Sequence, residues 1–129
     1  MPGVDSEMMR RDRASASLGM VVERADAGSA VVSMPLRDDM MNGHDITHGG
    51  FVFAVADTAF AIACNDDITP TVAAGADISF LKSTRAGQTL TATAVERVRQ
   101  GRSGIYDVTV VDETGDVVAE FRGRSRTLR

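Results

Sequence analysis

Apolar and polar residues alternate along several stretches of the chain, which is the pattern of β-strands with one buried face. The clearest example is residues 72–81, where apolar side chains fall at every second position: Ala74, Ala76, Ile78 and Phe80. Strand-like runs cover residues 19–25, 29–36, 72–81, 89–99, 105–111 and 117–126. Most of these runs are joined by short polar turns, so the sequence predicts a mainly antiparallel sheet.

Residues 51–64 break this alternation. They read FVFAVADTAFAIAC, and only Asp57 and Thr58 among them are polar. The segment is too short to span a bilayer, which takes about 20 apolar residues, and it is too long and too alanine-rich for a strand. It therefore predicts a helix that is buried nearly all round. Asn65, Asp66 and Asp67, followed by Pro70, mark its end.

The order of the elements predicts the architecture. The polar residues 5–17 are expected to form one short peripheral helix, and residues 37–47 a loop. An antiparallel sheet that buries one face needs a cover, and the apolar helix is the only element suited to this. The prediction is an α+β hotdog fold, a curved antiparallel sheet of five to six strands wrapped around one long central helix. We expect a single domain, residues 1–129, with residues 1–18 as a helical extension.

Composition narrows the classes of function. Acidic residues outnumber basic ones by 18 to 14, and the net charge is −4, which argues against a nucleic-acid partner. Residues 1–19 contain no apolar stretch, so we expect neither a signal peptide nor a membrane partner. The single cysteine, Cys64, cannot form an internal disulfide. One cysteine and two histidines are also too few ligands for a convincing zinc site. The sequence predicts a cytoplasmic protein without a metal.

Asp57 is the most unusual residue of the apolar segment. It has apolar neighbours on both sides and no cation within a helical turn. Burying an unpaired carboxylate costs several kcal/mol, so a purely structural helix would rarely keep one. Asp57 either faces solvent or bonds a nearby hydroxyl such as that of Thr58, or it is a nucleophile or general base in a cleft. We favour the functional interpretation.

The residues before the helix offer the second chemical feature. Thr47 is expected to be the N-cap, and Gly49 and Gly50 leave the first-turn N–H groups open to other molecules. Free N–H groups at the positive end of a helix dipole can polarise a carbonyl oxygen. The alternative is an ordinary capped helix, in which a neutral His48 bonds the backbone.

The spacing of these features predicts an assembly. Gly50 and Asp57 are seven residues apart, about 10 Å along a helix. Attack on a bound carbonyl needs the reacting atoms roughly 3 Å apart. One helix therefore cannot bring both groups to one carbonyl, whereas Asp57 of a second, antiparallel helix could. The geometry predicts a dimer with two shared sites.

Three segments carry a resemblance to a known family. Residues 42–65, NGHDITHGGFVFAVADTAFAIACN, resemble the signature of the PaaI-type (phenylacetate-degradation) hotdog thioesterases. The resemblance continues through DISFLKSTRAGQTLTATA and GIYDVTVVDETGDVVAEFRGRS. It implies a homotetramer of two hotdog dimers that hydrolyses aromatic acyl-CoA thioesters of the phenylacetyl or hydroxyphenylacetyl type. It also implies no metal and no cofactor, because coenzyme A is part of the substrate.

The resemblance assigns roles residue by residue. Asp57 is implied to be the catalytic acid group, and the backbone N–H of Gly49 to bind the thioester carbonyl. His48 is implied to orient the loop or the thioester, and Asn42 to position water or the leaving thiolate. The acid and the N–H group come from different subunits in this family. One departure is Gly75, which stands where many relatives carry a small hydroxyl residue.

Other residues are candidates for contacts with the substrate. Gly50 adjoins the predicted oxyanion site, and basic side chains can meet the phosphates of coenzyme A, although most surface arginines are simply solvated. The candidates are Lys82, Arg85, Arg102 and Arg124. His44 is either a surface-loop histidine or a second site histidine, and Cys64 is expected to pack in the core.

The sequence leaves several functions open. A thioesterase for medium-chain or other acyl-CoA is the nearest alternative. A hotdog hydratase or dehydratase and a non-catalytic acyl-CoA sensor belong to other classes. The sequence also leaves open whether Asp57 attacks the carbonyl directly or activates water.

Overall fold

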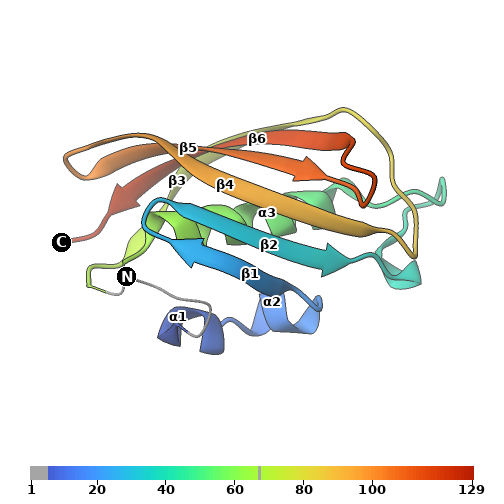
Figure 1. Cartoon of the computed structure of the whole chain (residues 1–129), viewed down its shortest axis with the longest axis horizontal. Coiled ribbons are helices and arrows are strands. Elements are labelled where there is room, and N and C mark those ends of the chain that lie inside the picture. Colours follow the sequence, from blue (N-terminus) through green and yellow to red (C-terminus); the bar gives the residue numbers. More distant parts are fainter. Residues whose placement is uncertain (1–5, 67) are drawn as a thin grey trace.

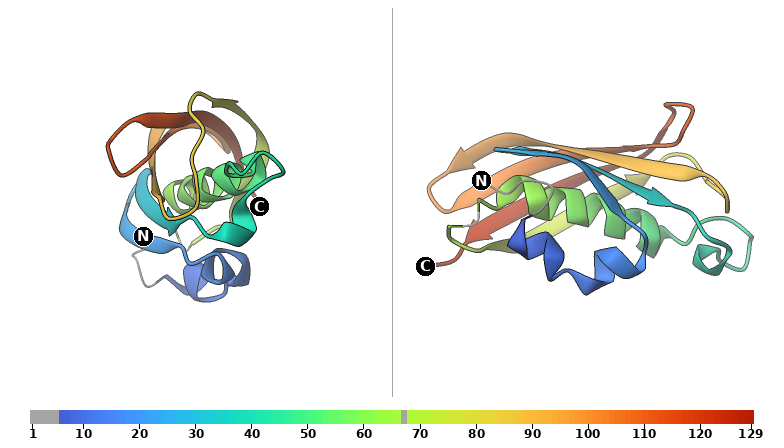
Figure 2. Two further views of the ribbon diagram at one scale, coloured as in Figure 1. Left: turned by 90° about the vertical axis from the view of Figure 1, so that its right-hand side faces the viewer. Right: turned by 60° about the horizontal axis from the view of Figure 1, so that its bottom comes forward.

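A single sheet of six strands curves around one long helix in the computed structural model, which describes residues 6–66 and 68–129 (Figure 1). The strands are β1 (Val21–Asp26), β2 (Ser29–Pro35), β3 (Thr71–Phe80), β4 (Thr89–Gln100), β5 (Ser103–Val111) and β6 (Val117–Thr127). They are antiparallel throughout and lie in the order β1-β2-β4-β5-β6-β3. The helix α3 (Gly49–Cys64) lies in the concave face, as the end-on view in Figure 2 shows. The predicted hotdog fold is confirmed, and each predicted strand lies within about two residues of its predicted bounds.

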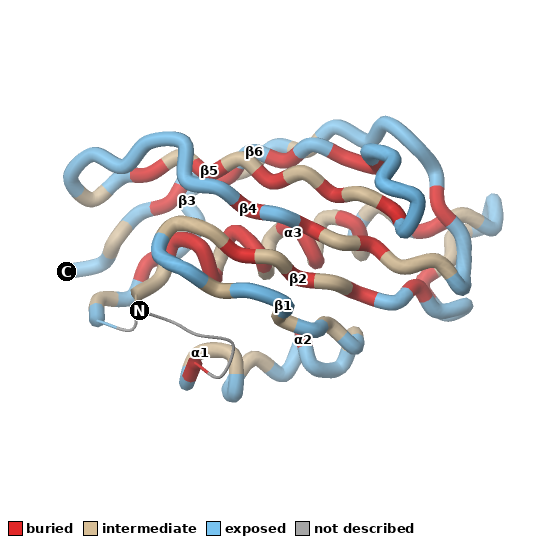
Figure 3. The backbone as a smooth tube through the Cα atoms, viewed as in Figure 1, coloured by how far each residue is buried: buried red, intermediate tan, exposed pale blue. Residues whose placement is uncertain are grey.

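The core lies between α3 and the inner face of the sheet. Alternate residues of the central strands are buried, which Figure 3 shows as alternating colours along β2, β4 and β5. The fully buried residues of these strands are Ala30, Val32, Met34, Leu90, Ala92, Ala94, Tyr106, Val108 and Val110. On α3 they meet small side chains such as Ala56 and Ala59, which allow the helix to lie close to the sheet. This close approach explains the alanine-rich composition of residues 51–64.

Gly123 on β6 shows how close the packing is. A Cβ atom at this position would lie 2.8 Å from ring atoms of Phe60, a buried residue of α3. Position 123 therefore has no room for a side chain while Phe60 keeps its place.

The N-terminal segment differs from the prediction. Residues 5–17 were expected to form one helix, but there are two short ones, α1 (Glu7–Arg10) and α2 (Arg13–Ser17). The reason is Asp12, whose carboxylate accepts a hydrogen bond from the backbone N–H of Ser15 and so starts a second helix. Residue 5 lies outside the described residues. Both helices lie along the side of the molecule next to β1 and α3 (Figures 1 and 2).

The loop between β2 and α3 is more ordered than predicted. Residues 37–47 contain the 3₁₀ turn η1 (Asp38–Met40) and a bridge between Met41 and Thr47. At the other end of α3, the side chain of Asn65 donates to the carbonyls of Ala61 (2.8 Å) and Thr71 (3.0 Å) and accepts from Thr71 N–H (2.9 Å). These bonds fix the helix against the start of β3. Within the described residues, no helix has the length and apolar character needed to cross a bilayer.

Candidate active site

The N-terminus of α3 is capped by His48. Its ring Nδ1 accepts a hydrogen bond from Gly50 N–H (3.3 Å), and its backbone is extended immediately before the first helical residue. The expectation that Thr47 is the cap is wrong, because the bridge to Met41 holds Thr47 one residue too early. Thr47 is buried instead, and its hydroxyl accepts a hydrogen bond from Thr84 (2.8 Å). A ring Nδ1 that accepts a bond carries no proton, so the cap requires neutral His48.

The backbone N–H of Gly49 is left open by this arrangement. Gly49 is the first residue of α3, and none of the described hydrogen bonds uses its N–H. It stands at the positive end of a 16-residue helix, where the orphan N–H groups and the dipole favour a developing negative charge. A Cβ atom at Gly49 would lie 3.0 Å from Cζ of Phe80, so this ring packs directly on the glycine.

A cavity of about 460 Å³ opens beside this helix end. Its lining includes Gly49, Asn42, Phe80 and Lys82, and it therefore brings three of the predicted site residues together. Asn42 Oδ1 accepts bonds from His44 N–H (2.9 Å) and Ile46 N–H (3.4 Å), which shapes the loop, and its amide NH₂ makes no bond to the described residues. The cavity can hold a small polar or acyl group next to an open N–H donor.

Asp57 lies in the third turn of α3 and is half-buried. Burial raises the pKa of its carboxyl above the ordinary value, and the negative charge of Asp12 raises it further. Among the described residues, no hydrogen bond or ion pair reaches this carboxylate, and the hydroxyl of Thr58 bonds Ser15 instead (2.9 Å). A carboxylate with a raised pKa and open lone pairs is suited to act as a base or a nucleophile.

Gly50 and Asp57 lie on one uninterrupted helix, so the seven residues between them span about 10 Å, as the sequence implied. Within one chain, the open N–H and the carboxylate therefore cannot reach the same carbonyl.

The four candidate cations are not gathered at one place. Lys82 lines the cavity and Arg85 is close to it, donating to the carbonyl of Asp45 (3.0 Å). Arg102 lies in the β4–β5 turn, at the opposite end of the sheet, and donates to the carbonyl of Thr127 (2.9 Å). Arg124 lies on β6 opposite Gly75, and its ion pairing is described below.

Two of these cations carry local ion pairs. Lys82 Nζ lies 2.6 Å from Asp112 and 2.7 Å from Asp116, and these hydrogen bonds raise its pKa. Arg124 pairs with Asp77 (2.8 Å), and its guanidinium covers Gly75, where a Cβ atom would lie 2.8 Å from Nη2. The sequence did not indicate that the Arg124 guanidinium covers Gly75.

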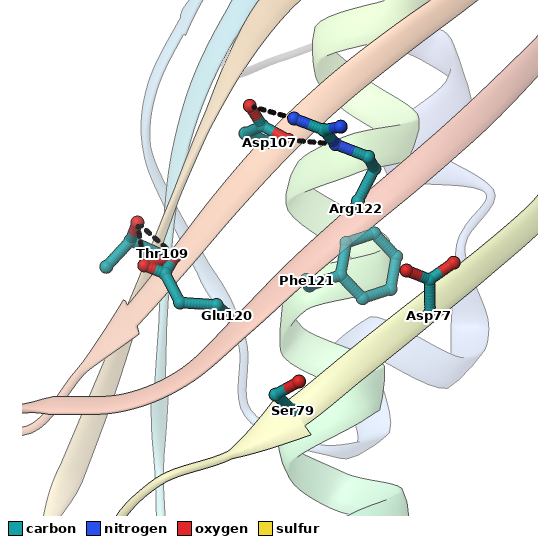
Figure 4. A pocket seen from close by; sticks show the side chains of 7 residues that line it. All are labelled: Asp77, Ser79, Asp107, Thr109, Glu120, Phe121 and Arg122. Carbon is teal, nitrogen blue, oxygen red and sulfur yellow. Dashed lines mark hydrogen bonds and ion pairs between the residues drawn. The ribbon is translucent and has the colours of Figure 1, made fainter.

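A larger hollow, about 570 Å³, lies on the sheet at β3, β5 and β6 (Figure 4). Four of its polar side chains form two pairs. Arg122 forms a bidentate pair with Asp107 (2.7 and 3.0 Å), and Thr109 donates to Glu120 (2.7 Å). None of the predicted site residues lines this hollow, so the cavity at the helix N-terminus is the better candidate site.

The remaining candidates have structural positions. Cys64 is buried, and burial raises the pKa of its thiol to about 11, so it stays protonated and packs in the core as predicted. His44 is exposed in the loop before α3. The described residues contain no group of three His, Cys, Asp or Glu side chains that could hold a metal ion.

Comparison with known proteins places this arrangement in a family. The sequence profile of the thioesterase superfamily matches residues 44–119, a range that includes His48, Gly49 and Asp57. The chain belongs to the thioesterase superfamily. As a member of this superfamily it is a thioester hydrolase, and the predicted resemblance to the PaaI-type hotdog thioesterases is confirmed.

Relatives of known structure support the same assignment. The acyl-coenzyme A thioesterase PaaI of Escherichia coli K12 is 42% identical over 121 residues, which are 94% of this chain and 86% of that protein. The structure of E. coli PaaI, from the phenylacetic acid degradation operon, superposes with a TM-score of 0.92 over 95% of this chain and 88% of that one. A mutant of the phenylacetic acid degradation protein PaaI of Thermus thermophilus is 38% identical, with a TM-score of 0.84 over 88% and 97% of the two chains.

Proposed function

We propose that this thioester hydrolase cleaves aromatic acyl-CoA thioesters of the phenylacetyl or hydroxyphenylacetyl type to the free acid and coenzyme A. The observation that carries the proposal is the pairing of an open N–H at Gly49 with an unbonded, half-buried carboxylate at Asp57 on the same helix. The choice of acyl group rests on the two PaaI relatives, both of which are named for phenylacetic acid degradation.

In the proposed reaction the thioester carbonyl oxygen accepts a hydrogen bond from Gly49 N–H at the positive end of α3. This bond strengthens as the oxygen becomes negative in the transition state. Asp57 either attacks the carbonyl carbon to give a mixed anhydride, which water then opens, or it takes a proton from the attacking water. In both routes the C–S bond breaks and the coenzyme A thiolate takes up a proton.

His48 and Asn42 support these steps in the proposed reaction. The bond from Gly50 N–H to His48 Nδ1 fixes the backbone that carries the Gly49 donor. The amide NH₂ of Asn42 makes no hydrogen bond to the described residues, so it can donate to water or to the leaving thiolate. Lys82 and Arg85, near the cavity, are the better placed of the candidate phosphate contacts. The reaction as proposed uses no metal and no cofactor.

We place each site between two subunits of a homodimer, and we expect pairs of dimers to form a tetramer. The separation of about 10 Å between Gly50 and Asp57 requires a second chain. β3 is an edge strand with unpaired backbone groups on one side, and it ends at the exposed Phe80, whose ring packs on Gly49. A second copy that pairs along this edge would come next to the helix N-terminus.

A thiol-release assay over a panel of acyl-CoA substrates tests the proposal. We expect phenylacetyl-CoA and hydroxyphenylacetyl-CoA to be hydrolysed fastest, and Asp57→Asn to lower kcat about 10²–10⁴-fold with little change in KM, because an amide is neither a base nor a nucleophile. Faster thiol release from medium-chain acyl-CoA would show that medium-chain thioesters, and not aromatic ones, are the substrate class. Saturable binding with no thiol release from any thioester would refute the proposal.

A further inference from the structure

Three side chains form a hydrogen-bonded chain between α2 and the centre of α3. Asp12 Oδ2 accepts a bond from Ser15 Oγ (2.7 Å), and Ser15 Oγ lies 2.9 Å from Thr58 Oγ1. Ser15 is buried, and Thr58 directly follows Asp57 on α3. The contact joins residues 43 positions apart in the sequence.

The hydrogen bonds of this series are all donated in the same direction. An ionised carboxylate only accepts hydrogen bonds, so Ser15 gives its single hydroxyl proton to Asp12. The contact between Ser15 and Thr58 must then be donated by Thr58. The chain therefore runs from Thr58 through Ser15 to the negative charge of Asp12, and each bond polarises the next.

Capping of α2 does not require this arrangement. The cap itself needs only Asp12 Oδ1 and the backbone N–H of Ser15, which are 2.9 Å apart. The second carboxylate oxygen and the two hydroxyls extend the cap to α3, at the residue next to the proposed catalytic carboxylate. α2 also screens this part of α3 from water, and burial is the larger cause of the raised pKa of Asp57.

The other titratable groups around α3 do not act on Asp57 in the same way. On α3 itself the second titratable group is Cys64, and β2 carries no charged side chain. Tyr106 on β5 points into the core and donates to Glu96 on β4 (3.0 Å). The remaining charged side chains described on α1, α2 and the strands are at least partly exposed, and most of them pair with one another. These are Glu7, Arg10, Arg13, Glu23, Arg24, Asp26, Asp77, Arg97, Arg99, Asp107, Glu120, Arg122, Arg124 and Arg126. Asp12 is the charged group, within the described part of the chain, that acts on Asp57.

We propose that Asp12, Ser15 and Thr58 are positioning residues that hold the N-terminal helix α2 against α3 beside Asp57, so that this segment is a working part of the active site. The proposal rests on the role of Asp57 given above and deepens it. Asp12 keeps the proton affinity of the Asp57 carboxylate high, and Ser15 and Thr58 keep Asp12 and the covering helix in place.

Side-chain ¹³C NMR titration of Asp57 in the full-length protein tests this directly. Asp12→Asn keeps a good N-cap and removes only the charge, so the pKa of Asp57 is expected to fall. Thr58→Val keeps the shape and removes the donor, so α2 loosens, its amide hydrogens exchange faster, and the pKa of Asp57 falls as well. Thr58→Ser keeps the hydroxyl and should behave as the unaltered protein. Glu7→Gln makes the same charge change on α1 and should leave the pKa of Asp57 unchanged.

The kinetic profile gives a second measurement. In Asp12→Asn the acid limb of kcat/KM should move to lower pH by the same amount as the NMR titration. An Asp57 pKa that is unchanged in both Asp12→Asn and Thr58→Val overturns the proposal, whatever the activity. If the pKa shifts appear but no thioester is hydrolysed, the positioning chain stands and the proposed function fails. If hydrolysis requires Asp57 but neither variant moves its pKa, the function stands and the positioning chain fails.

Discussion

At the scale of single residues, the proposed site depends on one N–H group and one carboxylate, and each can be removed with a matched control. Gly49→Pro deletes the N–H and fits the first position of a helix. Gly49→Ala keeps the N–H but makes a Cβ contact with Phe80 in the same place, 3.0 Å from Cζ. We expect kcat to fall about 10²–10³-fold more in Gly49→Pro than in Gly49→Ala, as for other lost oxyanion donors. Equal losses in the two variants, measured by steady-state kinetics, would assign the effect to packing.

The raised pKa of Asp57 also predicts a dependence of stability on pH. A carboxyl whose pKa is higher in the folded state binds its proton more tightly there, so it lowers stability once the pH rises above the unfolded-state value near 3.8. Asp57→Asn removes this penalty. Its Tm should exceed that of the unaltered protein at pH 7, and the difference should shrink as the pH falls through the raised folded-state pKa and vanish below about 4. A Tm difference that does not change with pH would mean that the carboxyl is not perturbed.

The surroundings of some candidate residues could be predicted from the sequence, and those of others could not. Asp57 was recognisable because an acid inside an apolar helix is costly, and the two glycines because they precede that helix. The cap was assigned to Thr47 instead of His48 because the choice depends on the Met41–Thr47 bridge, a tertiary contact that sequence spacing does not contain. Asp12 was missed for the same reason, since its partner Ser15 contacts Thr58, which is 43 positions further along the sequence.

At the scale of elements, Asn65 joins the end of α3 to the start of β3. Its side chain bonds the carbonyl of Ala61 and both backbone groups of the buried Thr71. Asn65→Ala leaves these groups without partners and is expected to cost about 1–3 kcal/mol in the free energy of unfolding. Urea denaturation at fixed protein concentration measures this. Asn65→Asp keeps the acceptor for Thr71 N–H and should lose less, and a neutral effect of Asn65→Ala would show that α3 is held by packing alone.

The elements themselves followed from the sequence with few exceptions. Alternation in two segments, together with β-branched runs and turn signals in the others, located the six strands. The apolar run located α3 to within two residues. The division of residues 5–17 into two helices was not predicted, because the polar segment has no periodic pattern and its geometry is set by the Asp12 cap.

At the scale of the whole molecule, the sheet ends in an open edge at β3, and the two reactive groups are too far apart within one chain. Shared sites in a dimer reconcile these two facts. The order of the strands in the sheet could not be predicted from the sequence. Short turns indicate that the strands they join are neighbours, but nothing in the sequence indicates that β3 lies beside β6. The length of the helix therefore led to the proposal of a second subunit, but the sequence did not indicate the edge at which it would bind.

Subunit complementation tests the shared site most directly. Gly49→Pro and Asp57→Asn chains, each inactive alone, are co-expressed with different affinity tags and the mixed dimers are purified. In a mixed dimer one of the two sites receives an intact Gly49 from one chain and an intact Asp57 from the other. The account predicts that a random mixture recovers about a quarter of the unaltered activity, and purified mixed dimers about half. Mixed dimers that remain as inactive as the parent variants would contradict it, because both groups would then have to act within a single chain.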